Sequence, residues 1–309
     1  MDPQGPDGRA GIDAALVQRL IATQFPYWAD LPVTPVEVDG WDNRTYRLGP
    51  VMTARLPTAA GYVAAVEKEA TWLPRLAASL PVAVPSVLAE GAPGEGYPYP
   101  WSVRGWLPGE TASPGRIDDM PRFAVSVAEF LLALQRCDTT EGPVAGAHSW
   151  HRGEPPACYD AQTRQYLTSL GGRADSAGVD LVRAAEVWAA ALAAAWDGPP
   201  KWFHGDVASG NLLVADGKLT AVIDFGTAGV GDPACDLVIA WVMFSGESRA
   251  AFRDAVRHDR GAWARARGWA LWKALLVLTE SIDTDPQKAD ECRRIIGEVL
   301  ADHEHLGRR

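Results

Sequence analysis

One segment of the sequence constrains the fold and the chemistry more than any other. It spans residues 204–226 and reads HGDVASGNLLVADGKLTAVIDFG. Two short apolar runs, LLVAD and LTAVIDF, flank the turn ADG, and this is the pattern of a two-stranded ribbon. Such a ribbon would bring Asp224 back beside Asn211, which follows Asp206 by five residues. The segment therefore predicts three polar side chains around one loop.

This set of side chains fits phosphoryl transfer. The reaction needs a carboxylate that orients the attacking hydroxyl, and hard oxygen ligands for a Mg²⁺ ion that bridges the nucleotide phosphates. The order His-Gly-Asp, then Asn, then Asp-Phe-Gly follows the logic of the catalytic and metal-binding loops of kinases. A chance HGD beside a chance hairpin is the alternative. Because all three parts occur in order and in register with the strand patterns, we favour the catalytic interpretation.

The rest of the chain divides into a β-rich part and a helical part. A short helix ends at Pro26, alternating runs occupy residues 33–56, and a helix over 62–80 is interrupted by a proline. Strands are expected at 82–89 and 99–106, and helices dominate from Met120 onward. The pattern predicts an α+β protein. Its predicted parts are a flexible tail (1–11), a β-rich amino-terminal lobe (12–105) and a mainly helical carboxy-terminal lobe (106–309).

Charge and composition exclude several classes of function. The net charge of −10 leaves no basic excess to neutralise a nucleic acid. It suits a cationic ligand, although an acidic surface that favours solubility explains it equally well. The longest apolar run, residues 237–244, is too short to span a bilayer, and the first residues do not resemble a signal peptide. The four cysteines form no CxxC pair, so a zinc site is not indicated. We expect a cytoplasmic monomer or homodimer without membrane or nucleic-acid partners.

The stretches HGDVASGNLLV, IDFG and GDPACDL are similar to the aminoglycoside phosphotransferase and choline-kinase-like branch of the protein-kinase-like fold. The resemblance implies a bilobal fold, with a small antiparallel-sheet lobe (12–105) that binds the nucleotide. The larger helical lobe (106–309) would carry the catalytic loop, the metal site and the acceptor-binding helices. The resemblance also implies a Mg²⁺-dependent enzyme that uses ATP or GTP. By the resemblance Asp206 is the catalytic carboxylate, and Asn211 and Asp224 are the metal ligands. Asp236 would hold the catalytic loop through backbone hydrogen bonds, and His204 would fix its shape.

The amino-terminal half departs from the kinase pattern in two ways. Kinases carry a lysine on the third strand, paired with a helix glutamate, to hold the nucleotide phosphates. Here the strand VMTARLP offers Arg55, and we expect it to pair with Glu69 on the following helix. Arginine keeps the positive charge of lysine, but its planar guanidinium would bind the phosphates in a different geometry. A solvated helix face is the alternative for Glu69.

The glycine-rich loop of kinases is absent. In its place the segment 40–46, GWDNRTY, resembles the nucleotide-covering turn of the family, with Asn43 and Arg44 near the phosphates. A hinge is expected in residues 101–107, WSVRGWL, where backbone groups of Arg104, Gly105 and Leu107 would read the purine edge. Gly105 stands where relatives carry a larger residue, so the choice between ATP and GTP stays open.

The acceptor pocket is expected in the helices around 148–196 and 263–300, where relatives build it. A cationic acceptor would be bound by carboxylates from these helices. The candidates are Glu154, Asp160, Asp175, Asp180, Glu186, Glu280, Asp283 and Asp285. Trp263, Trp269 and Trp272 lie at helical spacing, and they predict either core packing or an aromatic wall for a flat or apolar acceptor.

We expect the acceptor to be a hydroxyl of an antibiotic of the aminoglycoside, nucleoside or macrolide type, so that phosphorylation confers resistance. A kinase of a primary metabolite, such as choline, a sugar or homoserine, is an alternative that uses the same chemistry. A non-catalytic nucleotide-binding pseudokinase is a second alternative. The missing strand lysine and glycine loop suggest it, whereas the complete set of catalytic residues argues against it.

Overall fold

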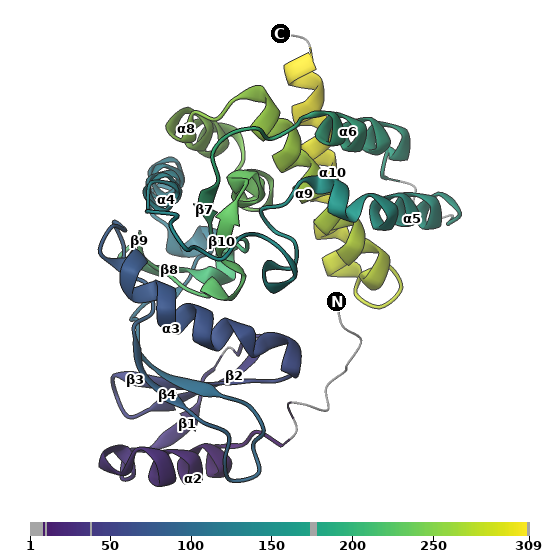
Figure 1. Ribbon diagram of the computed structural model, residues 1–309. Coiled ribbons are helices and arrows are strands. Elements are labelled where there is room, and N and C mark those ends of the chain that lie inside the picture. Colours follow the sequence, from purple (N-terminus) through teal and green to yellow (C-terminus); the bar gives the residue numbers. More distant parts are fainter. Residues whose placement is uncertain (1–8, 10, 38, 174–177, 308–309) are drawn as a thin grey trace. The chain divides into compact units, whose positions relative to one another are not determined.

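The computed structural model describes residues 9, 11–37, 39–173 and 178–307. Most of the predicted tail, 1–11, therefore lies outside the described residues. The chain forms two compact units. The first comprises Met1–Glu110, Leu213–Ala215 and Thr220–Gly226, and the second comprises Thr111–Leu212, Asp216–Leu219 and Thr227–Arg309. Figure 1 labels the elements of both. Because the first is built on a sheet and the second on helices, the predicted α+β class is confirmed.

A five-stranded antiparallel sheet forms the centre of the first unit, in the order β1-β2-β3-β5-β4. Its strands are β1 Val33–Pro35, β2 Asn43–Leu48, β3 Met52–Pro57, β4 Val87–Gly91 and β5 Trp101–Gly105. The predicted strand 82–89 is displaced, because Pro85 has no N–H for a ladder and β4 begins after it. The residues before Pro85 make a separate parallel bridge, between Ala83 and Ala221.

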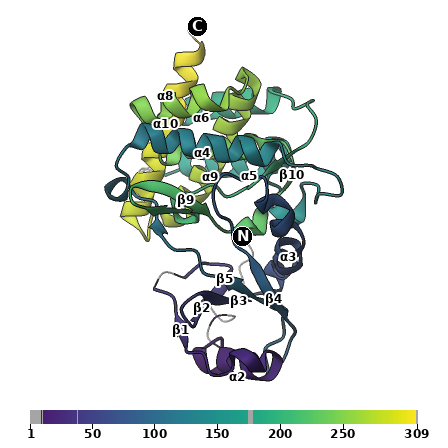
Figure 2. The ribbon, with the colours of Figure 1, turned by 90° about the vertical axis from the view of Figure 1, so that its left-hand side faces the viewer.

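Among the described residues of the first unit, the α-helices are α2 Ala14–Gln24 and α3 Ala64–Ala77. The Asp13 carboxylate caps α2 by accepting a hydrogen bond from the Leu16 amide at 2.7 Å. The apolar face of α2 packs into a core with β2, β3 and β5, and Figure 2 shows the helix beside the sheet. The prediction that Pro74 interrupts α3 is wrong. The helix continues for three residues beyond Pro74, although proline has no N–H to donate to the carbonyl oxygen four residues before it.

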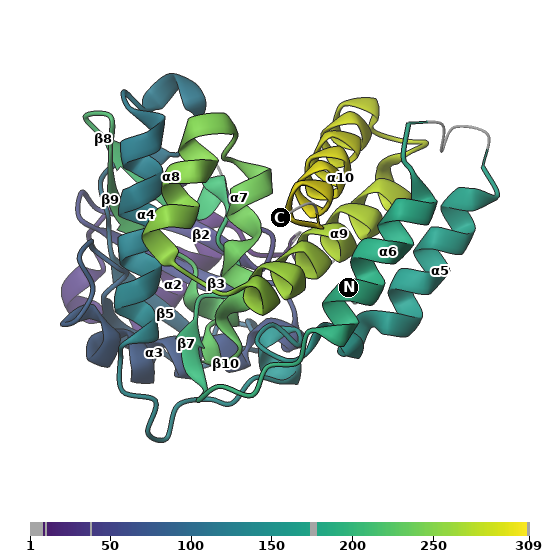
Figure 3. The same cartoon turned by 90° about the horizontal axis from the view of Figure 1, so that it is seen from above.

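The second unit is mainly helical. Its helices are α4 Met120–Gln135, α5 Asp160–Gly171, α6 Leu181–Ala193, α7 Ile239–Val242, α8 Gly246–Val256, α9 Arg260–Ser281 and α10 Pro286–Gly307. Helix α9 is buried on most of its circumference, as expected for a helix enclosed by others. Figure 3 shows α10, α9, α6 and α5 side by side, and α4 packed along α8. Not all of the part expected to be helical is α-helix, since α7 is preceded by a 3-10 helix, Pro233–Val238.

Short strands frame the segment that carries the motif. They are β6 Glu110–Thr111, β7 Lys201–Phe203, β8 Leu212–Ala215, β9 Lys218–Val222 and β10 Gly229–Gly231. Strands β8 and β9 form the predicted ribbon. Asp216 and Gly217 both have positive φ at its turn, as the Asp-Gly pair of a tight hairpin requires. Strand β7 pairs with β10 and leads directly into the loop of Asp206.

Among the described helices, none combines the length and the apolar character that crossing a membrane would require.

Candidate active site

Backbone hydrogen bonds hold the loop that follows β7 in one shape. The buried carboxylate of Asp236 accepts hydrogen bonds from the His204 amide at 2.8 Å and from the Gly205 amide at 2.7 Å. The His204 ring accepts a third bond through Nδ1 from the Asp206 amide at 3.2 Å. The predicted structural roles of Asp236 and His204 are confirmed. Gly205 has φ +84°, and a Cβ there would lie 2.9 Å from the hydroxyl of Thr227, so glycine is needed at this position.

Asn211 is bound to Asp206 across the same loop. The Nδ2 atom of Asn211 donates to the Asp206 carbonyl oxygen at 2.9 Å and to its carboxylate oxygen Oδ2 at 3.0 Å. These bonds engage the nitrogen of the Asn211 amide and leave its oxygen as the atom for a cation. An amide oxygen is a ligand that Mg²⁺ accepts in proteins. Asn211 therefore fits the predicted metal site by its chemistry.

The segment GDPACDL anchors the loop to helix α9. Asp232 forms a buried ion pair with Arg265 of α9, whose Nε lies 2.6 Å from Oδ2. The other oxygen of Asp232 accepts a hydrogen bond from the Ala234 amide and so caps the 3-10 helix that carries Asp236. One short motif thus fixes both the loop and the helix beside it.

Replacing Asp236 with Ala is expected to destabilise the second unit. Burial raises the pKa of Asp236, whereas His204 and the two backbone amides lower it. Without the carboxylate, these two buried N–H groups lose their acceptor, at roughly 1–3 kcal/mol each. Urea unfolding should therefore show a loss of at least about 2 kcal/mol. The exposed helical Asp254→Ala is the control, and an equal effect of both substitutions would contradict the assigned role.

A buried ionic network lies in the first unit, around Glu69 of α3. Its Oε2 atom lies 2.7 Å from Nη2 of Arg104 on β5, and its Oε1 atom lies 3.9 Å from Nη1 of Arg55 on β3. Oε1 also accepts a hydrogen bond from the Phe225 amide at 3.1 Å. Burial raises the pKa of Glu69, but the charges of Arg104 and Arg55 outweigh it and lower the pKa to about 2. Glu69 is thus a buried anion, and a solvated helix face is the wrong interpretation for it.

The predicted pair of Arg55 and Glu69 is one part of this network, and Arg104 is the partner that sequence reasoning missed. Ser102 lies opposite Arg55 in the sheet, and Arg104 follows two residues later on the same face. The side chain of Arg104 is 3% exposed, and Ser102 accepts a hydrogen bond from its Nε atom. Alternation along β5 was the signal that could have found it, because Ser102 and Arg104 share the face of Arg55.

Asp224 follows β9 in a left-handed backbone conformation, with φ +66°. This conformation is uncommon for a residue other than glycine and is concentrated at functional sites. Its Oδ1 atom lies 3.5 Å from Nη2 of Arg55 in the same unit. Arg55 thus links the two carboxylates of the network, Glu69 and Asp224, and holds Asp224 in place.

Lys68 is a second residue that the sequence analysis did not single out. It precedes Glu69 on α3 and is partly buried. Burial lowers the pKa of Lys68 to about 8, although the charges of Glu69 and Asp224 raise it in part. Lys68 therefore lies in the electrostatic field of the network and exchanges its proton near pH 8.

The pH dependence of stability tests this placement of Lys68. Between pH 8 and 10.5 the unfolded chain holds a proton on this lysine that the folded chain has lost. Lys68 should therefore contribute a rise with pH to the free energy of unfolding across this window. Lys68→Met is expected to stabilise the protein at pH 7, as measured by urea unfolding, and its advantage over the wild type should disappear toward pH 10.5. The exposed Lys218→Met is the control and should differ from the wild type by the same small amount at both pH values. An advantage of Lys68→Met that does not change with pH would contradict the prediction.

The nucleotide-covering turn is shorter than predicted. Strand β2 begins at Asn43, so Asn43 and Arg44 lie on a strand, and that part of the predicted turn 40–46 is wrong. The side chain of Arg44 pairs with Asp39, with 2.7 Å between Nη1 and Oδ2. Contact of Asn43 and Arg44 with nucleotide phosphates stays a prediction.

The predicted hinge residues differ in their backbone partners. Arg104 is paired with both β3 and β4, and the Gly105 amide donates to the Ser86 carbonyl at 3.0 Å. In the part of the chain that the structure describes, no hydrogen-bond partner engages the Leu107 amide. Leu107 therefore offers the donor best suited to a purine edge, and its contact with a nucleotide stays a prediction.

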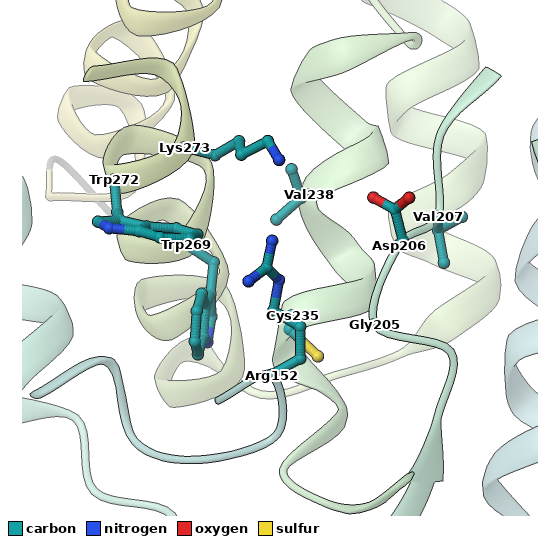
Figure 4. A pocket seen from close by; sticks show the side chains of 9 residues that line it. All are labelled: Arg152, Gly205, Asp206, Val207, Cys235, Val238, Trp269, Trp272 and Lys273. Atoms are coloured by element: carbon teal, nitrogen blue, oxygen red, sulfur yellow. The ribbon is translucent and has the colours of Figure 1, made fainter. Parts of the chain in front are cut away.

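A pocket that is partly open to solvent lies beside Asp206 in the second unit. The residues that line it come from the catalytic loop, the 3-10 helix, α9 and the loop before α5, and Figure 4 shows them. They are Arg152, Gly205, Asp206, Val207, Cys235, Val238, Trp269, Trp272 and Lys273.

The predicted acceptor residues differ in whether they line this pocket. Trp269 and Trp272 are 3% and 4% exposed, which bears out core packing, and they also line the pocket, whereas their contact with an acceptor stays a prediction. Trp263 instead packs in the core. The described acidic candidates do not line the pocket, and several form ion pairs elsewhere, as Glu154 does with His151. Asp175 lies outside the described residues.

Comparison with known proteins identifies the family. The sequence profile of the phosphotransferase enzyme family matches residues 33–269. The chain belongs to this family. The match confirms the resemblance that the motifs indicated. By its family the protein is a phosphotransferase. A comparison with curated protein sequences found no match.

Solved structures of phosphotransferases share the fold. The GDP complex of aminoglycoside 2'-phosphotransferase-IIIa is 17% identical with a TM-score of 0.70, covering 94% of this chain and 100% of that chain. A macrolide 2'-phosphotransferase from Brachybacterium faecium is 22% identical with a TM-score of 0.60, covering 92% and 97%. A thermostable aminoglycoside phosphotransferase mutant, in a ternary complex with ADP and hygromycin B, is 20% identical with a TM-score of 0.64, covering 92% and 98%. The predicted protein-kinase-like fold class is confirmed.

Proposed function

We propose that the protein transfers the γ-phosphate of ATP or GTP to a hydroxyl group of a small molecule. The observation that carries the proposal is the position of Asp206, on a loop fixed by Asp236 and at the edge of a small-molecule pocket. There Asp206 would accept a hydrogen bond from the acceptor hydroxyl and orient it for in-line attack. The GDP and ADP complexes of similar structures support a nucleotide as the phosphate donor.

We further propose that Asn211 and Asp224 are the ligands of Mg²⁺. The ion would neutralise charge on the phosphates when it is bound. The engagement of the Asn211 amide nitrogen by Asp206, which leaves the amide oxygen as the atom for a cation, and the anchoring of Asp224 by Arg55 support this assignment. Arg55 would also steady the phosphates. Asn43, Arg44 and the backbone of Arg104, Gly105 and Leu107 are proposed nucleotide contacts.

The acceptor classes can be separated by one screen. The purified protein is incubated with ATP or GTP, Mg²⁺ and single acceptors, and release of ADP or GDP is measured. The panel contains aminoglycosides, macrolides, nucleosides, choline, sugars and homoserine. Stimulated release with one acceptor, together with a phosphorylated product by mass spectrometry, supports the proposal. Tight nucleotide binding without transfer to any of them would favour a pseudokinase.

An antibiotic is the first acceptor class to test, because the similar structures include aminoglycoside and macrolide phosphotransferases. A strain that expresses the protein should then survive the antibiotic that the enzyme phosphorylates. The pocket also favours the second candidate, a kinase of a primary metabolite. Its cationic side chains, Arg152 and Lys273, do not suit a polycationic aminoglycoside.

A further inference from the structure

We infer that the acceptor carries an anionic group, a carboxylate or a phosphate, which binds to Arg152 and Lys273 beside Asp206. The inference rests on the proposed function and names the chemical class of its acceptor. Two of the pocket-lining side chains are cations, and Asp206 is the one carboxylate among the described lining residues. In Figure 4 the guanidinium of Arg152 and the ammonium of Lys273 extend into the space that Asp206 faces.

The backbone around Arg152 is built to hold this side chain in place. Trp150 and His151 both have positive φ, and Gly153 follows with φ +83°. Consecutive left-handed residues other than glycine are rare and persist where the surroundings fix them, as at ligand sites. The hydroxyl of Ser149 donates to the Arg152 carbonyl at 2.9 Å. The tight turn therefore places the guanidinium at the pocket wall.

The two tryptophans support Arg152. Its guanidinium carbon lies over the ring of Trp272, 4.9 Å from the centroid, and 5.9 Å from the centroid of Trp269. Tyr159 stacks on the Trp272 ring with 4.0 Å between centroids. Protein groups thus pack against the Trp272 ring, and little of either indole is exposed to a ligand. The two tryptophans therefore support the guanidinium of Arg152, and it is this guanidinium that would contact the acceptor.

Arg152 is not neutralised by the protein. Its Nη1 atom donates to the Trp150 carbonyl at 3.0 Å, and in the described parts of the chain no carboxylate lies within ion-pair distance of it. Glu154, two residues away, pairs with His151, and Asp160 pairs with Arg164. Planar guanidinium groups bind carboxylates and phosphates through two parallel hydrogen bonds. An acceptor anion would complete this pairing and hold the hydroxyl near Asp206.

Binding of three matched polyhydroxy compounds tests the inference. Gluconate, sorbitol and glucosamine offer similar hydroxyls with an anionic, a neutral and a cationic group. Their dissociation constants are measured by calorimetry on the whole protein, saturated with a non-hydrolysable ATP analogue and Mg²⁺ so that the nucleotide site is filled. We expect gluconate to bind roughly tenfold more tightly than sorbitol or glucosamine. Equal binding, absence of binding, or preference for glucosamine would overturn the inference.

Single variants identify the groups that bind the anion. Arg152→Gln and Lys273→Gln should each reduce the preference for gluconate, whereas Lys288→Gln, an exposed lysine of α10 outside the pocket, should keep it. Lys273 is also exposed, so its replacement leaves the fold intact even if Arg152→Gln proves unstable. A preference that survives both changes would overturn the assignment.

Affinity for the ATP analogue is measured in the same variants. If Arg152→Gln lowers the affinity for the ATP analogue and leaves the affinity for gluconate unchanged, the cations bind the nucleotide phosphates and the inference fails. The proposed function is judged separately, by Asp206-dependent transfer of the phosphate. If Asp206-dependent transfer persists while the protein shows no preference for gluconate, the anionic class of the acceptor is refuted and the proposed function is not.

Discussion

Replacing Asp206 with Asn is expected to lower kcat for phosphoryl transfer by roughly 10²–10⁴-fold, the range attributed to general acid–base groups. An amide cannot take the proton of the attacking hydroxyl, although its oxygen can still accept the hydrogen bond from Asn211. The fold and the affinity for nucleotide should therefore change little. Steady-state kinetics on the acceptor found in the screen, with thermal unfolding of both proteins, measures the two effects.

Asp216→Asn is the matched control for this prediction. Asp216 lies at the turn of the ribbon, is exposed, and has a positive φ that asparagine tolerates. The control removes the same charge from the same segment and should keep full activity. A wild-type kcat in Asp206→Asn would remove Asp206 from the reaction, and an equal loss in both variants would indicate a nonspecific effect of charge.

The second large effect concerns stability. Glu69→Gln should lower the free energy of unfolding by about 3–5 kcal/mol, because it leaves a buried arginine without its counter-ion. Arg104 and Glu69 are each 3% exposed, and Nη1 of Arg104 already has no hydrogen-bond partner in the described structure. Urea unfolding at neutral pH measures the loss. The exposed Glu67→Gln on the same helix is the control and should stay within about 0.5 kcal/mol of the wild type.

The pH dependence of this loss follows from the pKa of Glu69. The folded-state pKa of about 2 is depressed below the ordinary 4.5, so the unfolded chain binds the proton more readily. The contribution of Glu69 is therefore complete above pH 4.5 and is lost as the pH falls toward 2. Wild type and Glu69→Gln should differ most near neutrality and converge in acid. A difference that is constant with pH would contradict the ionic account.

The ribbon and the catalytic loop could be predicted because their contacts are local in sequence. Asn211 binds a residue five positions before it, and the ribbon turns at an Asp-Gly pair whose conformation favours a tight hairpin. The structural role of Asp236 could be predicted only through the family resemblance, because the residue lies 31 positions from Gly205.

The ion pair of Arg104 with Glu69 and the placement of Arg152 could not be predicted in the same way. Arg104 meets Glu69 across 35 positions because β5 pairs with β3, with Ser102 opposite Arg55. That pairing order depends on tertiary packing. Arg152 follows two residues in the left-handed conformation, Trp150 and His151, and a tryptophan in the sequence does not predict this conformation.

Transfer of label from the nucleotide tests the central claim most directly. Wild type and Asp206→Asn are incubated with γ-labelled ATP or GTP, Mg²⁺ and the mixed acceptor panel, and labelled products are separated from nucleotide and inorganic phosphate. The account predicts a labelled small molecule with wild type and almost none with Asp206→Asn. Label that appears solely in inorganic phosphate, or equally with both proteins, would contradict it.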